Sequence, residues 1–379
     1  RGFAPDLVTY TIPRPANPAA VRVLDGAGAA LPAQVTIGAD GQAALSFVTA
    51  LPPGATVRYT LRDDGQGPAA APAVSATQDG DALILANQLL AVKTPAPQTK
   101  TFDRPVAAEA LPAPILAFRG PDGAWRGAGS LRLKRPVTQF AVTRTAQGPV
   151  FTEVRYRLDY AGGGYYQATV RVTDRAPFAQ VREEYDLGTD ADTDCWQLDL
   201  SAGWQPDAAE HMNVAGQGNG PVQYPSLAQE EKAKPGNINP ALNTDNGGDL
   251  PLRFIHHDSC WGSKFVAFYG IHAAAARKAD PNQYPMAIVA PLHKGDWRRS
   301  PSLPVYVKDG QVRVQLPMAT WPSSWLNEPR SDVSPFSCHE HDAALPVTYG
   351  RRVWALVLAK PAHHVTGYGD ATTTASPAY

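Results

Sequence analysis

The sequence predicts an all-β protein, in which a large antiparallel, supersandwich-like β-sandwich follows a small N-terminal β-barrel or sandwich. Apolar and polar residues alternate over three long runs between residues 148 and 188, which is the period of strands with one buried face. The chain of 379 residues also contains 36 Pro and 32 Gly, which separate short apolar runs as turns do. Helical periodicity is nearly absent, since only residues 271–278 could form a short helix.

The three alternating runs predict long antiparallel strands of a large sheet. Residues 153–160 alternate, Ala161-Gly-Gly-Gly164 supplies a turn where positive φ costs little, and residues 165–172 and 179–187 continue the pattern. The charged face predicts exposed cross-strand pairs, each worth a few tenths to about 1 kcal/mol. Glu183 is the exception, because the alternation puts it on the apolar face, where its carboxylate needs a partner or a raised pKa.

The other elements follow in order from the spacing of apolar runs and turn signals. Residues 1–75 predict the small N-terminal domain, and residues 76–360 predict the large sandwich. Within the sandwich, residues 93–113 are expected to be irregular and residues 202–250 to form a long loop excursion. Beyond the sandwich, residues 361–379 are expected to form an unpacked tail. The further predicted strands are 7–12, 21–24, 33–37, 43–48, 56–61, 81–87, 115–118, 131–133, 137–143, 195–200, 252–256, 264–269, 286–290, 305–308, 312–316 and 347–358.

Charge, hydropathy and cysteine content exclude some classes of function and leave others open. Lys plus Arg number 34 and Asp plus Glu number 35, so we expect no basic surface for nucleic acid. No apolar run approaches the roughly 18 residues of a membrane span. Cys195, Cys260 and Cys338 allow one disulfide and a free thiol, or no disulfide at all. The chain begins at Arg1 without a signal peptide, which fits an exported protein whose leader was removed and equally fits an artificially shortened chain.

Side chains able to carry chemistry gather in three clusters, at residues 253–261, 293–299 and 338–342. In the first cluster, His256 and His257 would face opposite sides of a strand, so both reach one site only through a bulge. The candidate catalytic residues are His256, His257, Asp258, His293, His339 and Glu340. The candidate substrate-binding residues are Trp261, Trp297, Arg298, Arg299, Trp321 and Trp325.

The His, Asp, Glu, Trp and Arg side chains of these clusters suit the cleavage of a polysaccharide. An acidic polysaccharide is favoured, because the arginines can pair with its carboxylates. A polysaccharide lyase needs a base that removes the proton α to a uronate carboxylate, and a cation that neutralises that carboxylate. His256, His257, His293 or His339 could be the base, and Arg298 or Arg299 could be the cation. A glycoside hydrolase instead needs a pair of carboxyl groups, for which Asp258 and Glu340 are the candidates. The arginine fork pairs with carboxylate, and the indole ring stacks on a sugar.

Two segments suggest a divalent cation as the only cofactor. His339 and His341 would share one face of a strand, which suits zinc, but a catalytic zinc usually needs three protein ligands. The third ligand would have to come from residues 256–258, and a polar loop without metal is the alternative. Residues 243–249 are rich in Asn and Asp and could bind calcium, but they lack the spacing of an EF-hand loop, so a turn is the alternative.

The middle of the chain carries a strand at Leu83–Gln88, a turn at Asp122-Gly-Ala-Trp125, and a Tyr-rich hairpin that closes on Val181-Arg-Glu-Glu184. Together with the strand at 347–354, this pattern resembles the central β-sandwich of exo-rhamnogalacturonan lyase-like proteins. The resemblance implies a small N-terminal β-barrel, then a large sandwich, then an α/α-toroid. The residues after Lys360 are too few to form the toroid, and no catalytic residue is carried over from the family.

Composition, clusters and resemblance together lead to two functional hypotheses. The first is a carbohydrate-active enzyme, a polysaccharide lyase or glycoside hydrolase, that acts on an acidic polysaccharide and is secreted or periplasmic. The second is a non-catalytic carbohydrate-binding or structural β-sandwich portion of a larger enzyme or surface protein. In the second case, Trp125, Trp297, Trp321 or Trp325 would line a groove without converging titratable groups. The enzyme hypothesis instead requires the three clusters to converge on one pocket.

Overall fold

The computed structural model describes residues 3–38, 40–65, 71–121, 123–133 and 135–186, together with the separate strands between Cys195 and Val357 that are named below. In this part of the chain, antiparallel strands joined by turns make up the fold, and the only helices are the short 3₁₀ helices η1 (Pro18–Ala20) and η2 (Ala108–Ala110). The prediction of an all-β protein is therefore confirmed. The predicted domain limits, 1–75, 76–360 and 361–379, stay predictions.

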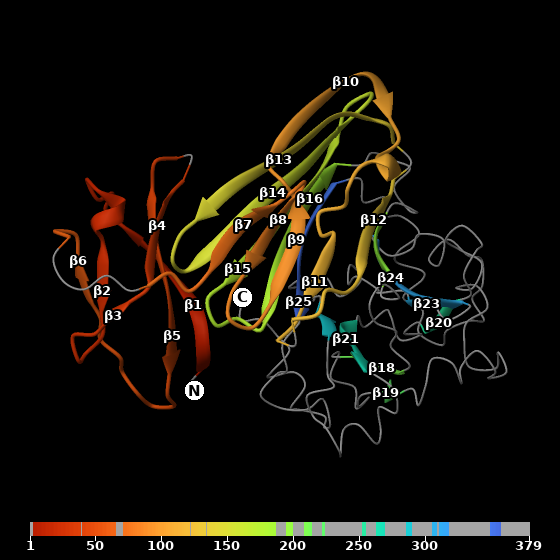
Figure 1. Ribbon diagram of the computed structural model, residues 1–379. Coiled ribbons are helices and arrows are strands. Elements are labelled where there is room, and N and C mark those ends of the chain that lie inside the picture. Colours follow the sequence, from red (N-terminus) through yellow and green to blue (C-terminus); the bar gives the residue numbers. More distant parts are fainter. Residues whose placement is uncertain are drawn as a thin grey trace.

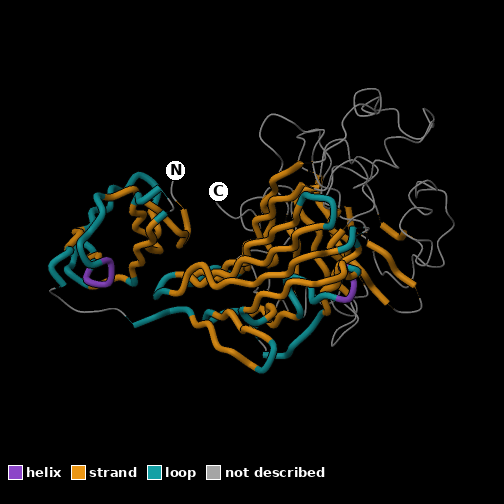
Figure 2. The backbone as a smooth tube through the Cα atoms, turned by 90° about the horizontal axis from the view of Figure 1, so that it is seen from above, coloured by secondary structure: helices purple, strands orange, loops and turns teal. Residues whose placement is uncertain are grey.

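Two small sheets form the N-terminal part of the molecule (Figure 1). Their orders are β1-β5-β4 and β3-β2-β6, and Val21, Val23, Leu45 and Phe47 pack together as their core. Figure 2 shows these strands as a lobe beside the larger stack of strands. The strands of the lobe are β1 (Phe3–Ile12), β2 (Arg22–Leu24), β3 (Ala30–Leu31), β4 (Ala33–Ile37), β5 (Ala43–Leu51) and β6 (Thr60–Arg62).

The larger part of the molecule contains a ten-stranded antiparallel sheet, with the order β10-β13-β14-β15-β16-β25-β22-β21-β18-β19. Strands β14, β15 and β16 are the three that the alternation predicted, and each pairs with the next. Strand β16 then pairs with β25, which places Phe178 opposite Val357. The strands are β10 (Gln98–Val106), β13 (Val137–Gln147), β14 (Phe151–Tyr160), β15 (Tyr165–Thr173), β16 (Phe178–Asp186), β25 (Tyr349–Val357), β22 (Met286–Val289), β21 (Ser263–Tyr269), β18 (Ala208–Asn213) and β19 (Val222–Gln223).

A four-stranded sheet, β11-β9-β8-β7, packs its inner face on the ten-stranded sheet and completes a sandwich (Figure 1). Leu83, Leu85 and Phe118 bury their side chains from this sheet in one core with Phe140 and Tyr156 of the larger sheet. A five-stranded sheet has the order β12-β17-β24-β23-β20. These strands are β7 (Ser75–Asp79), β8 (Ala82–Ala86), β9 (Ala91–Pro95), β11 (Ala117–Arg119), β12 (Ala128–Arg132), β17 (Cys195–Asp199), β20 (Leu252–Phe254), β23 (Val305–Lys308) and β24 (Gln311–Pro317).

Tyr156 occupies the centre of the core. Its ring centroid lies 5.3 Å from that of Phe140 and 6.2 Å from that of Tyr166, and its hydroxyl donates to the Pro112 carbonyl at 2.8 Å. Burial, with the nearby Tyr160 as a smaller cause, raises the pKa of Tyr156 well above its usual value, so the hydroxyl stays a neutral donor. Full burial of a large apolar side chain stabilises a fold by about 1.5–3 kcal/mol, so this aromatic centre is a main support of the sandwich.

Glu183 lies in the same core and is 2% exposed, as the alternation predicted. Its Oε1 accepts from the Tyr166 hydroxyl at 2.7 Å, and its Oε2 accepts from Trp354 Nε1 at 2.7 Å. Of the two alternatives, the structure shows partners, one on β15 and one on β25. Because a buried acceptor without a donor is costly, these bonds tie β25 to the central hairpins.

Two segments differ from their predicted structure. Residues 93–113 contain β10, and Pro105 is tolerated there because β10 is an edge strand, where a missing N–H breaks no inner ladder bond. Residues 202–250 contain β18 and β19, where a loop excursion without strands was expected. The sequence Ala-Ala-Glu-His-Met-Asn of β18 does not alternate, so its pairing along β21 makes it a strand rather than any local pattern.

Candidate functional site

The side chains predicted to carry catalysis, substrate binding or metal binding all lie outside the described residues. They are His256, His257, Asp258, Trp261, His293, Trp297, Arg298, Arg299, Trp321, Trp325, His339, Glu340 and His341. Residues 243–249, the predicted calcium segment, also lie outside them. The convergence of the three clusters on one pocket therefore stays a prediction.

In the described part of the chain, no group of three or more His, Cys, Asp or Glu side chains is placed to hold a metal ion. The same residues include no helix that is long and apolar enough to cross a membrane.

Trp125 is the predicted sugar-contacting aromatic residue that the structure does describe. It ends a turn whose arms are joined by the bridge between Phe118 and Arg126, with N···O distances of 2.9 and 2.8 Å. Gly127 follows with φ of 73°, and a Cβ atom there would lie 2.3 Å from the Phe118 ring. Phe118 faces the core, and its bridge partner Arg126 starts from the same face of the sheet. Trp125, one position before Arg126, therefore lies on the outer face of the four-stranded sheet, beside Arg119.

Two cations lie against the Trp125 ring on that outer face, and one carboxylate lies against one of these cations. Lys93 lies opposite Ala117, and Arg119 lies two positions beyond Ala117, so the two cationic side chains share one face. Lys93 Nζ is 4.7 Å and Arg119 Cζ is 5.0 Å from the centroid of the Trp125 ring. Lys93 Nζ also pairs with Asp79 Oδ2 at 3.1 Å. We call Asp79, Lys93, Arg119 and Trp125 the Trp125 cluster.

The Trp125 cluster combines an aromatic face with an excess of positive charge. Trp125 is half-buried, and two cations against one carboxylate leave a net charge of one positive unit. An indole ring offers a surface for the apolar face of a sugar, and the cations offer partners for a sugar carboxylate. The alternative is that the contacts only hold the turn, since a cation–π contact at an exposed site is worth about 0.5–1 kcal/mol.

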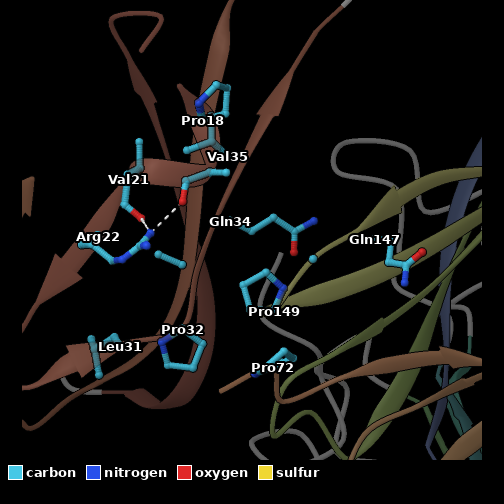
Figure 3. A pocket seen from close by; sticks show the side chains of 13 residues that line it. Pro18, Val21, Arg22, Leu31, Pro32, Gln34, Val35, Pro72, Gln147 and Pro149 are labelled. Atoms are coloured by element: carbon cyan, nitrogen blue, oxygen red, sulfur yellow. Dashed lines mark hydrogen bonds between the residues drawn. The ribbon is translucent and has the colours of Figure 1, made fainter. Parts of the chain in front are cut away.

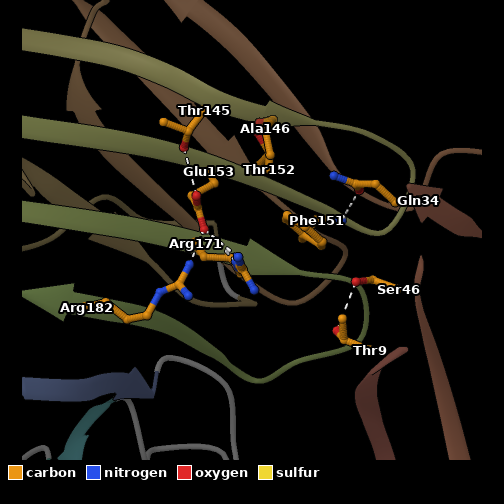
Figure 4. A network of polar contacts seen from close by, with 10 residues as sticks. All are labelled: Thr9, Gln34, Ser46, Thr145, Ala146, Phe151, Thr152, Glu153, Arg171 and Arg182. Atoms are coloured by element: carbon orange, nitrogen blue, oxygen red, sulfur yellow. Dashed lines mark hydrogen bonds and ion pairs between the residues drawn. The ribbon is translucent and has the colours of Figure 1, made fainter. Parts of the chain in front are cut away.

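Glu153 forms a second polar cluster, on the outer face of the ten-stranded sheet (Figure 4). Its Oε2 accepts from Arg171 Nε at 2.8 Å and from Arg182 Nη2 at 2.5 Å, and its Oε1 accepts from Thr145 Oγ1 at 2.8 Å. Arg171 Cζ lies 4.1 Å from the Phe151 ring. Glu153 is 9% exposed, so the prediction of exposed pairing is wrong for this residue, because the two arginines cover its carboxylate.

The electrostatics of Glu153 indicate a structural role. Burial raises the pKa of Glu153, but the charges of Arg171 and Arg182 and the hydrogen bond from Thr145 outweigh it, so the pKa lies below its usual value. A catalytic acid needs a raised pKa at neutral pH, which is the opposite shift. We therefore assign the Glu153 cluster to the stability of the sheet.

The neighbouring charges on this face also pair, but Arg157 and Asp159 pair along β14 and not across strands as the alternation predicted. Arg157 Nη2 lies 2.7 Å from Asp159 Oδ1, with the two side chains 37% and 30% exposed. Arg157 Cζ also lies 4.2 Å from the Tyr165 ring, whose hydroxyl donates to Glu184 Oε1 at 2.8 Å. Exposed pairs of this kind contribute up to about 1 kcal/mol each.

A groove of about 480 Å³ lies between the N-terminal lobe and the ten-stranded sheet (Figure 3). Gln34 crosses this junction, because its Oε1 accepts from the backbone amides of Val150 at 3.2 Å and Phe151 at 3.0 Å. Gly148 permits the approach, since a Cβ atom there would lie 2.4 Å from Gln34 Cδ. These contacts fix the lobe against the start of β14.

The lining of the groove suits a junction between parts of the fold better than a sugar site. Its cation, Arg22, donates from Nη1 to the carbonyls of Ala19 at 2.7 Å and Val21 at 2.9 Å. No aromatic ring is among the residues that line it, whereas a sugar site combines such a ring with converging polar groups. The lining residues are mainly proline and aliphatic, and include Pro18, Pro32, Pro72, Pro149, Leu31 and Val35.

The sequence pointed to Trp125 but not to the residues around it. Lys93 lies in Ala91–Pro95, which matches no functional motif, and only the pairing of β9 with β11 brings it to the ring. The available signal was the alternation of β9, which puts Lys93 on the face opposite to the buried Val92. Gln34 gave no signal, because its partners are backbone amides far away in the chain.

No protein-family model matches the chain, and no curated protein matches it significantly. Among solved structures, a protein of glycosyl hydrolase family 38 from Enterococcus faecalis has a TM-score of 0.45 and 10% identity, over 94% of this chain and 43% of that protein. An alpha-mannosidase from Enterococcus faecalis has a TM-score of 0.43 and 11% identity, over 95% and 42%. A TPR-domain containing protein from Parabacteroides distasonis has a TM-score of 0.30 and 8% identity, over 95% and 56%.

The chain spans less than half the length of the two Enterococcus faecalis proteins. The three TM-scores are all below 0.5 and are too low to establish a shared fold. The described residues by themselves define an all-β protein with an antiparallel sandwich and a cationic aromatic cluster on its outer face. None of the three proteins is described as a rhamnogalacturonan lyase, so the resemblance to that family stays a prediction.

Proposed function

We propose that this chain belongs to a carbohydrate-active protein whose partner is an acidic polysaccharide or oligosaccharide. The observation that carries the proposal is the Trp125 ring with Lys93 and Arg119 beside it on the outer face of a sheet. The ring supplies a stacking surface for a sugar, and the cations supply charge for a uronate.

The proposed activity is that of a polysaccharide lyase or a glycoside hydrolase, secreted or periplasmic. For a lyase, a histidine among His256, His257, His293 and His339 removes the α proton, and Arg298 or Arg299 neutralises the uronate carboxylate. For a hydrolase, Asp258 and Glu340 act as the carboxyl pair. In either case the Trp125 cluster contributes to binding of the polysaccharide.

A non-catalytic carbohydrate-binding portion of a larger protein is the second candidate. It is favoured by Glu153 and Glu183, the two carboxylates that are buried within described strands. Glu153 is held between arginines, and Glu183 accepts from Tyr166 and Trp354, so both serve the sandwich. In this candidate, binding at Trp125 is the function of the described part of the chain.

Affinity electrophoresis of the full chain in gels that contain polygalacturonate, and in gels with neutral polysaccharides, tests the proposal. We expect retardation by polygalacturonate, and Trp125→Ala should weaken it about tenfold, since a ring contact and its buried area account for about 1.4 kcal/mol. Tyr10→Ala is the matched control, because Tyr10 is an aromatic side chain 54% exposed on the N-terminal lobe. Absence of retardation by every polysaccharide, or equal loss in both variants, would overturn the proposal.

Incubation with the same polysaccharides separates the candidates. A rise in ultraviolet absorbance from an unsaturated uronate supports the lyase, and new reducing ends without that absorbance support the hydrolase. Binding without either product supports the non-catalytic portion.

A further inference from the structure

The Trp125 cluster contains an anion of its own, and we propose that this anion, Asp79, competes with the acidic sugar for Lys93. In the free protein, Asp79 Oδ2 holds Lys93 Nζ at 3.1 Å. In the complex, a uronate carboxylate takes the place of Asp79, also meets Arg119, and lays its sugar ring against Trp125. Asp79 is thus a specificity-determining residue, and this inference rests on the function proposed above for the cluster.

The backbone register places Asp79 within reach of the same cations as the sugar. Asp79 pairs with Ala82 on β8, and Lys93 pairs with Ile84 two positions further along β8, so both charged side chains rise from the outer face of the sheet. Ala82, opposite Asp79, and Ala117, opposite Lys93 on β11, carry only methyl groups, whereas Ile84 lies opposite Lys93 on β8. The two alanines leave room for a sugar above the sheet beside Asp79 and on the Arg119 side of Lys93.

The ion pair is exposed enough to be exchanged for a ligand. The side chain of Asp79 is 58% exposed and that of Lys93 is 26% exposed, and an ion pair in such a position contributes little to stability. Within the described part of the chain, Arg119 contacts the Trp125 ring and makes no ion pair. A carboxylate that replaces Asp79 therefore meets a second cation that Asp79 does not use.

Removing the competing anion should tighten binding of an acidic glycan. We expect Asp79→Asn to lower the Kd for polygalacturonate about three- to fivefold, the range that an exposed ion pair allows. Lys93→Gln should raise that Kd by a similar factor, since the same contact is lost from the complex. Both effects should shrink as salt is added, because exposed charges are screened.

Three comparisons make the test specific for the carboxylate. Asp103→Asn changes the net charge by the same amount as Asp79→Asn, but Asp103 is exposed on β10 of the ten-stranded sheet. The Kd of this variant for polygalacturonate should therefore equal that of the unchanged protein. Methyl-esterified polygalacturonate keeps the sugar and loses the charge, so Asp79→Asn should not tighten its binding. Dextran sulfate offers sulfate without uronate, and we expect weaker binding to it than to polygalacturonate.

The outcomes that would overturn this inference differ from those that would overturn the proposed function. No gain in Asp79→Asn, an equal gain in Asp103→Asn, or an equal gain on the methyl ester would each refute the competition by Asp79. Tighter binding to dextran sulfate than to polygalacturonate would refute the uronate as the ligand. If the unchanged protein and every variant bind no polysaccharide, the proposed function itself fails.

Discussion

Replacing Glu153 by Gln removes the charge that two arginines share on the outer face of the ten-stranded sheet, while nearly keeping the size of the side chain. In the folded protein, the carboxylate accepts from Arg171, Arg182 and Thr145. We expect the variant to fold and to lose about 2 kcal/mol of its free energy of unfolding at neutral pH, mainly through Arg171.

The magnitude follows from the exposure of each partner. The side chains of Arg171 and Glu153 are 18% and 11% exposed, and breaking a buried pair costs about 3–5 kcal/mol, here at the lower end because some water reaches both groups. Arg182 is 44% exposed, so its share is at most about 1 kcal/mol. The amide oxygen of glutamine still accepts a hydrogen bond, which offsets about 1 kcal/mol of the loss.

The pH dependence of Glu153 provides a second measurement of the same effect. Because the folded-state pKa of Glu153 is lowered, its stabilisation is fully present above the unfolded-state value of about 4.3 and is lost as pH falls through the folded-state pKa. The difference in unfolding free energy between the unchanged protein and Glu153→Gln should therefore be largest near neutral pH. It should shrink as the pH falls below the usual range of a glutamate.

Urea unfolding followed by circular dichroism measures these differences. Asp159→Asn is the matched control, because Asp159 lies on the same strand and pairs with Arg157 at the surface, where the loss should stay below about 1 kcal/mol. If Glu153→Gln costs no more than Asp159→Asn, or if its cost does not decrease in acid, the assignment of Glu153 as a buried ion-pair centre is refuted.

Two further substitutions test the other buried contacts. Gln34→Ala leaves the backbone amides of Val150 and Phe151 without their acceptor. We therefore expect the free energy of unfolding to fall by about 1–3 kcal/mol, and hydrogen exchange at these two amides to become faster. Unchanged exchange would contradict the role of Gln34. Glu183→Ala removes the acceptor of the Trp354 indole from the core. We therefore expect the free energy of unfolding to fall by at least about 3 kcal/mol, and the tryptophan fluorescence to shift. That shift should vanish in a Trp354→Phe background, and its persistence would show that another tryptophan reports it.

The sequence by itself determined the fold class, the central strands and the face on which each of their residues lies. The alternation along β14, β15 and β16 is a local property, because successive side chains of a strand point to opposite faces whatever the strand pairs with. It therefore placed Glu183 in the core correctly. It also located the turn that carries Trp125, since turn residues act over a few positions.

Only the tertiary structure decided which residues meet. Glu183 and Trp354 are 171 positions apart, and they bond because β16 pairs with β25. Lys93 reaches Trp125 in the same way, through the register of β9 on β11. Alternation fixes the face but not the neighbour, because the register between distant strands is set by the packing of whole sheets. For the same reason the burial of Glu153 could not be predicted, since it depends on arginines that two other strands bring over it.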